Sequence, residues 1–208
     1  CSGVVCFVEQ KTGYEIHRWL EFRRVLCRSE HPDAIVAGDL DGDGRSDLAV
    51  ANRDSANLSV LYSRGDRGFD VDTLVIGEGR PEQLVLLDLN NDGLLDLATG
   101  HSGVASTLLN LGERRFGAPR FFYHEVSRPA DFVAGDLDGD GDLDLVGGSQ
   151  KDMKVFWYEQ LPNDVYAPRM VATETAGLSE LDIADLDKDG DLDILASTHK
   201  AFTWYKDL

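Results

Sequence analysis

The sequence has few of the features that mark disulfide-linked, membrane-spanning or nucleic-acid-binding proteins. Its three cysteines, Cys1, Cys6 and Cys27, lie in the first 27 residues, so the remaining chain has neither a disulfide nor a thiolate metal site. No stretch reaches the roughly 18 apolar residues that a membrane helix needs. Only 20 lysines and arginines stand against 38 aspartates and glutamates, and the net charge of −18 argues against nucleic acid as a partner.

The acidic excess has two explanations, and the positions of the aspartates decide between them. A soluble, self-repelling surface needs only a scatter of acidic residues. Divalent-cation sites need them at regular short spacings. Four segments share the pattern D-x-[DN]-x-D-G-x-x-D without a gap, namely residues 39–47, 88–96, 136–144 and 185–193. Their first residues are 49, 48 and 49 positions apart, so the chain contains an internal repeat.

Short apolar runs flank each acidic segment, and they are too short and too rich in β-branched residues for helices. One run precedes the segment, one follows it, and a third strand comes after that. The first three repeats add a fourth strand beyond a turn. Four strands in about 49 residues make one propeller blade, which cannot bury its faces without neighbours. We therefore predict an all-β fold, a β-propeller with four visible blades at about residues 31–79, 80–128, 129–177 and 178–208, the last one incomplete.

The aspartate pattern provides side-chain oxygens at positions 1, 3, 5 and 9 of each segment, and residue 7 can add its backbone carbonyl. Hard oxygen ligands in that number suit Ca²⁺, which takes about six to eight oxygens. Position 6 is always glycine, where a chain that wraps around a cation turns sharply. With nothing bound, carboxylates this close would repel one another. The pattern predicts up to four calcium sites, one in each repeat.

Two alternatives explain part of this pattern. A tight turn between strands needs one aspartate and one glycine, not four spaced oxygens. A helical calcium motif begins in the same way but places an acidic ligand at position 12. That position lies inside an apolar run here, and its residues are Val50, Thr99, Gly147 and Ala196. The pattern therefore favours a metal-binding loop between strands.

With their flanking strands, the acidic segments resemble the FG-GAP/VCBS repeat, which occurs in the propellers of integrin α-subunits and in many secreted bacterial proteins. The likeness covers about residues 31–208, and residues 155–159 and 202–206 are similar to the bacterial form. The resemblance implies one ligand set for each repeat: Asp39, Asp41, Asp43, Arg45 (through its carbonyl) and Asp47; Asp88, Asn90, Asp92, Leu94 and Asp96; Asp136, Asp138, Asp140, Asp142 and Asp144; Asp185, Asp187, Asp189, Asp191 and Asp193. Asn90 leaves the second set one carboxylate short, so we expect it to bind Ca²⁺ most weakly.

The sequence leads to separate expectations for the two ends of the chain. Residues 1–29 lack the repeat and resemble translated sequencing-adapter read-through, so we expect the repeats to occupy residues 30–208 alone. A genuine amphipathic leader or an extra strand is the alternative for this segment. The fourth repeat stops at Leu208, at the end of its third strand. Because this family usually builds about six to eight blades, the resemblance implies a fragment of a larger propeller.

Three functions fit such a module. The first is a calcium-binding propeller of a secreted or cell-surface protein that acts in adhesion or in glycan or protein binding. The second is the propeller of a secreted, lyase-like enzyme that degrades polysaccharides, and the third is a purely structural spacer. The sequence contains no G-x-S-x-G or H-E-x-x-H motif, and the loops account for most acidic pairs. No catalytic residue can be named, so the first function is favoured.

Two further features bear on ligand and location. Trp157-Tyr158 and Trp204-Tyr205 could form sugar-stacking platforms, but neighbours on a strand face opposite sides, so we expect at least one of each pair to pack between blades. Loops of this kind are expected to bind Ca²⁺ in the range of about 10⁻⁴–10⁻³ M that is typical of extracellular modules. This predicts an extracellular, periplasmic or cell-surface protein that does not insert into the membrane.

Overall fold

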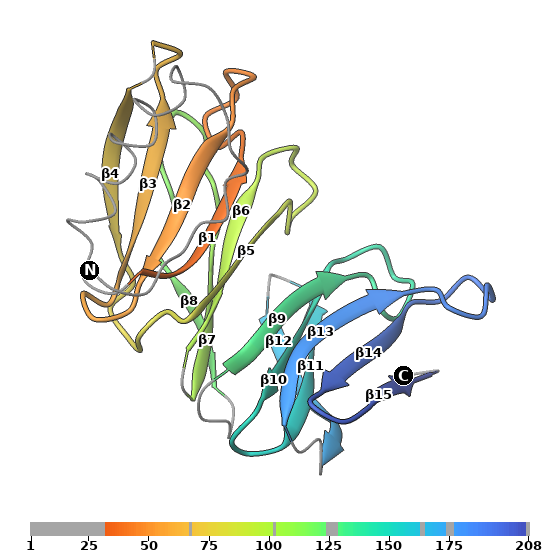
Figure 1. The fold of residues 1–208 in the computed structure, drawn as a ribbon. Helices are drawn as coiled ribbons and strands as arrows, with labels where there is room; N and C mark the ends of the chain where they lie inside the picture. Colours follow the sequence, from red (N-terminus) through yellow and green to blue (C-terminus); the bar gives the residue numbers. More distant parts are fainter. Residues whose placement is uncertain are drawn as a thin grey trace, which may run out of the picture.

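The structure, a computed structural model, describes residues 32–66, 68–101, 103–123, 129–162, 165–173 and 177–206. All regular secondary structure in these ranges is β-strand, and none of these residues forms a helix long and apolar enough to cross a membrane. The strands form four antiparallel sheets in which consecutive strands are neighbours (Figure 1). The prediction of an all-β fold is confirmed. Residues 1–29, which we expect to lie apart from the repeats, are outside the described residues.

Each sheet corresponds to one repeat, and we call the sheets blades 1 to 4. The strands of blades 1 and 2 are β1 (Pro32–Gly38), β2 (Asp47–Asn52), β3 (Asn57–Ser63), β4 (Phe69–Val75), β5 (Gln83–Leu87), β6 (Asp96–Gly100), β7 (Val104–Leu108) and β8 (Arg120–Tyr123). Those of blades 3 and 4 are β9 (Pro129–Gly135), β10 (Asp144–Ser149), β11 (Lys154–Leu161), β12 (Val165–Thr173), β13 (Leu178–Ala184), β14 (Asp193–Thr198) and β15 (Phe202–Tyr205). Blade 4 has three strands in the described residues, which confirms the incomplete fourth blade.

Burial explains why the apolar runs in the sequence do not alternate with polar residues. The middle strands β2, β3, β6, β7 and β10 are buried along nearly their whole length. A strand covered on both faces reads as a continuous apolar run rather than an alternating one. By contrast, the last strand of blade 1, β4, is mostly exposed.

Successive blades cover one another through three clusters of buried side chains. The cluster between blades 1 and 2 includes Tyr62 and Leu97, and the one between blades 2 and 3 includes Phe122 and Tyr158. A third cluster, around Trp157, joins blades 3 and 4. The first strands of the blades contact one another in the order β1, β5, β9 and β13. In the described part of the chain, the four sheets do not close into a ring (Figure 1).

The two Trp-Tyr pairs differ because their blades differ in position. Trp157 and Tyr158 are only 4% and 1% exposed, and they belong to different inter-blade clusters because β11 has a blade on each side. The expectation that at least one of this pair packs between blades is confirmed. In blade 4, Tyr205 packs against the cluster between blades 3 and 4, whereas Trp204 is 45% exposed. Trp157 and Tyr158 therefore cannot act as sugar-stacking platforms.

Replacing Gly147 with alanine should destabilise the protein by about 1–3 kcal/mol, because an added methyl group would overpack the centre of blade 3. Its Cβ would lie 3.0 Å from Phe132 Cδ2 and 3.3 Å from Tyr158 Cε2, both on rings that are themselves buried. Urea unfolding measures the change. The control is Gly117→Ala, whose Cβ would meet nothing closer than the Leu109 carbonyl oxygen at 3.6 Å. Equal losses in the two variants would contradict this packing.

Candidate metal centre

The four acidic segments occupy the same place in every blade. The first loop (residues 39–47), second loop (88–96), third loop (136–144) and fourth loop (185–193) each connect the first strand of a blade to its second. Position 1 directly follows the first strand, and position 9 is the first residue of the second strand. All thirty-six loop residues are described. The prediction that the acidic segments are loops between strands is confirmed.

Each loop turns twice through the left-handed backbone region. Position 6 is Gly44, Gly93, Gly141 or Gly190, with φ between 81° and 108°. Position 4 also has positive φ in every loop, and its residues are Gly42, Asn91, Gly139 and Lys188. A Cβ at Gly44 would meet nothing within 4 Å, so backbone conformation and not space requires glycine there. The sharp turn predicted at position 6 is confirmed. The turn at position 4 was not predicted from the sequence.

The aspartate at position 1 holds the loop in shape. In all four loops one of its carboxylate oxygens accepts the backbone N–H of the position-6 glycine, at 2.8 Å for Asp39 and Asp88. The position-5 carboxylate likewise accepts the N–H of position 7, for instance from Arg45 to Asp43 at 2.8 Å. Short polar side chains of this kind stabilise turns by bonding to backbone two to five residues on. The loop backbone therefore fixes where these carboxylates lie.

The aspartate at position 9 has a structural role that the spacing pattern does not reveal. Asp47, Asp96 and Asp144, here called the latch aspartates, are at most 1% exposed. One oxygen of each accepts the backbone N–H of position 2 in its own loop, and the other accepts a backbone N–H near the end of the third strand. Around Asp96 these distances are 2.8 Å from Leu89 and 2.6 Å from Asn110. Each latch thus ties the loop to the sheet.

The latches also connect neighbouring blades. Asn110 and Gln160 each donate a backbone N–H to the latch aspartate of their own blade. Their side-chain amides reach the preceding blade, where they donate to the carbonyls of Leu40 at 2.9 Å and Leu89 at 3.1 Å. Both carbonyls belong to position 2 of the preceding loop. The acidic loops are therefore part of the junction between blades.

Burial has an electrostatic consequence for the latches. It raises the pKa of Asp96 and of Asp144 to about 6, because a buried carboxylate loses hydration that two backbone hydrogen bonds only partly replace. The pKa of Asp47 is raised by the same cause. Neighbouring loop carboxylates add a smaller repulsion in the same direction. A cation in the loop would relieve that repulsion.

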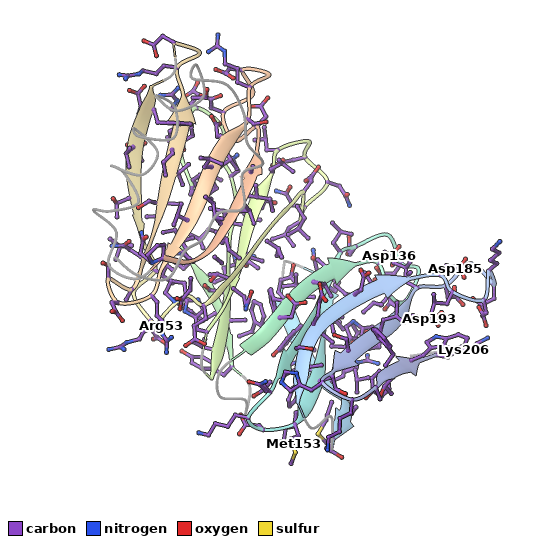
Figure 2. All side chains as sticks on the ribbon, in the orientation of Figure 1. Arg53, Asp136, Met153, Asp185, Asp193 and Lys206 are labelled. Atoms are coloured by element: carbon purple, nitrogen blue, oxygen red, sulfur yellow. The ribbon has the colours of Figure 1, made fainter. Side chains whose placement is uncertain are left out.

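Three of the four loops gather carboxylates closely enough to share a cation. In the first and third loops the group consists of positions 1, 3 and 5, and in the fourth it consists of Asp185, Asp187 and Asp193. Within each group the candidate ligand oxygens all lie within 4.8 Å of one another. Figure 2 shows Asp185 and Asp193 at the outer end of blade 4, with Lys206 beside them. In the second loop Asn90 replaces one carboxylate, and its amide donates to Asp92 Oδ2 at 3.0 Å.

The donor set of these groups fits a hard divalent cation. Every side chain that the groups offer is a carboxylate, without imidazole or thiolate, which suits Ca²⁺ better than Zn²⁺. The latch aspartates lie beneath the loops, and only in the fourth loop does the position-9 side chain join the group. The complete ligand sets, including the position-7 carbonyls, therefore stay a prediction.

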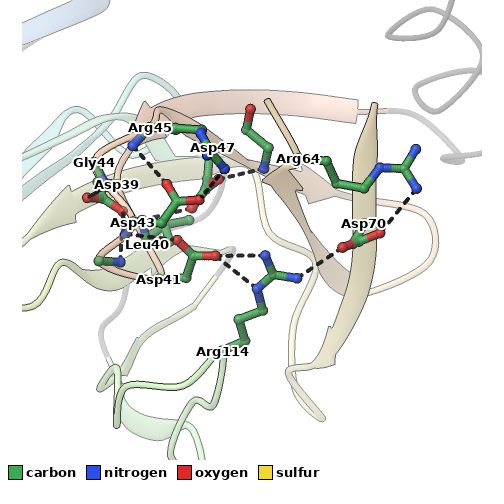
Figure 3. A network of polar contacts seen from close by, with 12 residues as sticks. Asp39, Leu40, Asp41, Asp43, Gly44, Arg45, Asp47, Arg64, Asp70 and Arg114 are labelled. Atoms are coloured by element: carbon green, nitrogen blue, oxygen red, sulfur yellow. Dashed lines mark hydrogen bonds and ion pairs between the residues drawn. The ribbon is translucent and has the colours of Figure 1, made fainter. Parts of the chain in front are cut away.

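Cationic side chains face two of the loops. Arg114, from the connection between β7 and β8, contacts Asp41 in the first loop, and Arg45 pairs with Asp43 at 2.9 Å (Figure 3). Lys206 contacts Asp187 and Asp189 in the fourth loop. Arg114 lies 73 residues after Asp41, so no local pattern could have indicated this pair. The four loops differ in their charged surroundings although their sequences are alike.

Comparison with known proteins supports both the repeat and the fold. Residues 39–99, 88–147 and 136–196 each match the model of the FG-GAP-like repeat. Each match begins at position 1 of one loop and ends in the strand after the next loop. Together the matches extend over residues 39–196. Comparison with curated proteins gives no significant match.

Solved structures with a similar fold come from proteins of different kinds. One is an Agrocybe aegerita lectin that recognises non-reducing terminal N-acetylglucosamine, with a TM-score of 0.56 and 21% identity over 78% of this chain and 46% of that one. Another is BBS1N in complex with ARL6DN, with a TM-score of 0.59 and 13% identity over 86% of this chain and 55% of that one. This chain spans about half the length of either structure. At these identities the likeness concerns the fold alone.

Replacing the latch Asp144 with alanine should lower the free energy of unfolding in chelator by about 2 kcal/mol or more, because two buried backbone N–H groups lose their acceptor. These groups belong to Leu137 and Gln160. Chemical denaturation measures the loss. The control is Asp142→Ala, which removes an acidic side chain from the same loop. Among the described contacts of this loop, the Asp142 side chain accepts no hydrogen bond, so this variant should be nearly as stable as wild type. Similar losses in both variants would show that Asp144 does not act as a latch.

The raised pKa of Asp144 predicts how this loss depends on pH. Because the folded-state pKa of about 6 exceeds the unfolded value of 3.8, proton uptake stabilises the folded wild type as pH falls. This contribution to the free energy of unfolding is fully present below the pKa of Asp144 in the unfolded chain. It is lost as the pH rises through the pKa of Asp144 in the folded protein. The stability gap between wild type and Asp144→Ala in chelator should therefore be larger at acidic than at neutral pH. A gap that stays constant or shrinks on acidification would contradict the assignment.

Proposed function

This chain belongs to the FG-GAP-like repeat family, and on that premise we propose that its acidic loops bind Ca²⁺ and that the blades form a calcium-stabilised binding module. The observation that carries the proposal is the convergence of three carboxylates in the third loop. Asp136, Asp138 and Asp140 bring oxygens within 4.8 Å of one another. Backbone amides of the same loop hold each of these side chains in place. The loop is organised for a cation before one arrives.

The proposed ligands are the side chains at positions 1, 3 and 5 together with the position-7 carbonyl. The position-9 carboxylate completes the set while it keeps its latch bonds, because a carboxylate has about four acceptor sites and the latch uses only one on each oxygen. In the fourth loop Asp193 accepts an N–H from Leu186 at 3.1 Å and also lies in the acidic group, which supports this double use. A bound Ca²⁺ would neutralise the repulsion among the loop carboxylates.

For the module as a whole we favour recognition of a glycan or a protein outside the cell. The two similar structures are a lectin with a sugar ligand and a protein in complex with a partner, so this fold serves both purposes elsewhere. The net charge of −18 makes a polyanionic partner unfavourable. Weak, oxygen-only loops fill at the millimolar calcium levels found outside cells, which supports an extracellular, periplasmic or cell-surface location.

Calcium titration followed by NMR tests the loops individually. The amides of Gly44, Gly93, Gly141 and Gly190 each donate to the position-1 aspartate, so each reports on its own loop. We expect all four signals to shift at millimolar calcium, with Gly93 last, because the second loop has one carboxylate fewer. Asp138→Ala should abolish the response of Gly141 and leave the other three.

Two outcomes would contradict this proposal. If no loop glycine responds to calcium, the loops are only turns between strands. If Gly93 saturates first, the number of carboxylates does not determine the order of filling.

A further inference from the structure

We propose that Arg114 is a built-in competitor of the metal in the first loop, a cationic side chain from blade 2 that must release Asp41 before a divalent cation can use that carboxylate fully. This inference rests on the proposed calcium binding and concerns its regulation. It predicts that the first loop binds Ca²⁺ more weakly than its own carboxylates would allow. It also predicts that Arg114 holds blades 1 and 2 together when calcium is low.

The contact between Arg114 and the first loop is direct, and it joins a partly exposed guanidinium, 36% exposed, to a largely buried carboxylate. Nε and Nη2 of Arg114 both lie on Asp41 Oδ2, at 2.9 Å and 2.8 Å (Figure 3). The Asp41 side chain is only 8% exposed. It is also one of the three side chains whose oxygens converge in this loop. Because a guanidinium and a cation would share the Asp41 carboxylate at close range, their charges would repel each other.

Arg114 is held in this position from three other directions. Its Nη1 donates to Asp70 Oδ2 at 3.1 Å, and its guanidinium lies 4.5 Å from the centre of the Tyr62 ring. Its backbone has φ of 60° in a turn closed by a hydrogen bond from the Arg115 N–H to the Gly112 carbonyl at 3.0 Å. Asp70 and Tyr62 both belong to blade 1, as Asp41 does. The side chain is therefore a fixed bridge from blade 2 to blade 1.

The other loops show that this cation is not a general feature of the repeat. The fourth loop has a cation from its own blade instead, because Lys206 directly follows β15 and contacts Asp187 and Asp189. In the third loop, the described part of the chain places no lysine or arginine in an ion pair with Asp136, Asp138 or Asp140. The third loop should therefore fill first, because nothing positive has to leave.

Arg114→Gln tests the inference, because it removes the charge while keeping a polar side chain of similar reach. In an NMR titration with calcium chloride, the concentration that half-saturates the Gly44 amide should fall about fivefold, the size expected for one lost ion pair. The response of Gly141 should not change. In chelator the thermal midpoint of the variant should lie below that of wild type. Adding calcium should raise the midpoint of the variant by more than it raises that of wild type.

Arg64→Gln is the matched control. Arg64 also pairs with Asp70, at 3.5 Å, but among the described contacts it reaches no carboxylate of the first loop. The control substitution therefore removes the same charge from the same surroundings. If the control tightens the first loop as much as Arg114→Gln does, bulk charge and not competition is responsible, and the inference is wrong. It is also wrong if Gly141 responds to calcium while Gly44 saturates equally in wild type and Arg114→Gln. If no loop glycine responds in any protein, the proposed calcium binding fails first.

Discussion

A buried carboxylate beneath each acidic loop is the interaction on which the rest of this structure depends. Asp47, Asp96 and Asp144 each accept two backbone N–H groups, one from the loop and one from the region that ends the third strand. Because a buried N–H without an acceptor is costly, this arrangement fixes the loop and the sheet relative to each other. The carboxylates at positions 1, 3 and 5 of the first and third loops can then lie close together above the sheet.

The same network explains how separate sheets become one array. Asn110 and Gln160 each donate a backbone N–H to the latch aspartate of their own blade. Their side-chain amides donate to a backbone carbonyl in the loop of the preceding blade. Apolar clusters lie between successive blades, and these amide contacts add a polar link between blades 1 and 2 and another between blades 2 and 3. A cation in one loop would therefore act close to the junction with the next blade. Arg114 crosses the same junction with a charge of its own.

The periodic part of this architecture could be predicted from the sequence, and the long-range part could not. The spacing of Asp39, Asp88, Asp136 and Asp185 determines the number of blades, and the apolar runs around them locate the strands. The latch role of Asp144 was not predictable, because a latch requires the same residue type that the metal-site pattern predicts at this position. The contact of Arg114 with Asp41 joins residues far apart in sequence and depends on how two blades pack. Trp157 and Tyr158 are both buried for a similar reason, since neighbouring blades cover both faces of β11.

The central claim is that the acidic loops are metal-binding elements that stabilise the blades, and a thermal melt of the whole chain tests it most directly. The melt is recorded with millimolar calcium and again with chelator. A ligand that binds only the folded state stabilises it by RT ln(1 + [L]/Kd) at each site, so several weak sites acting together should raise the midpoint clearly. A cooperative melt with the same midpoint in both conditions would contradict the claim and leave the loops as turns between strands.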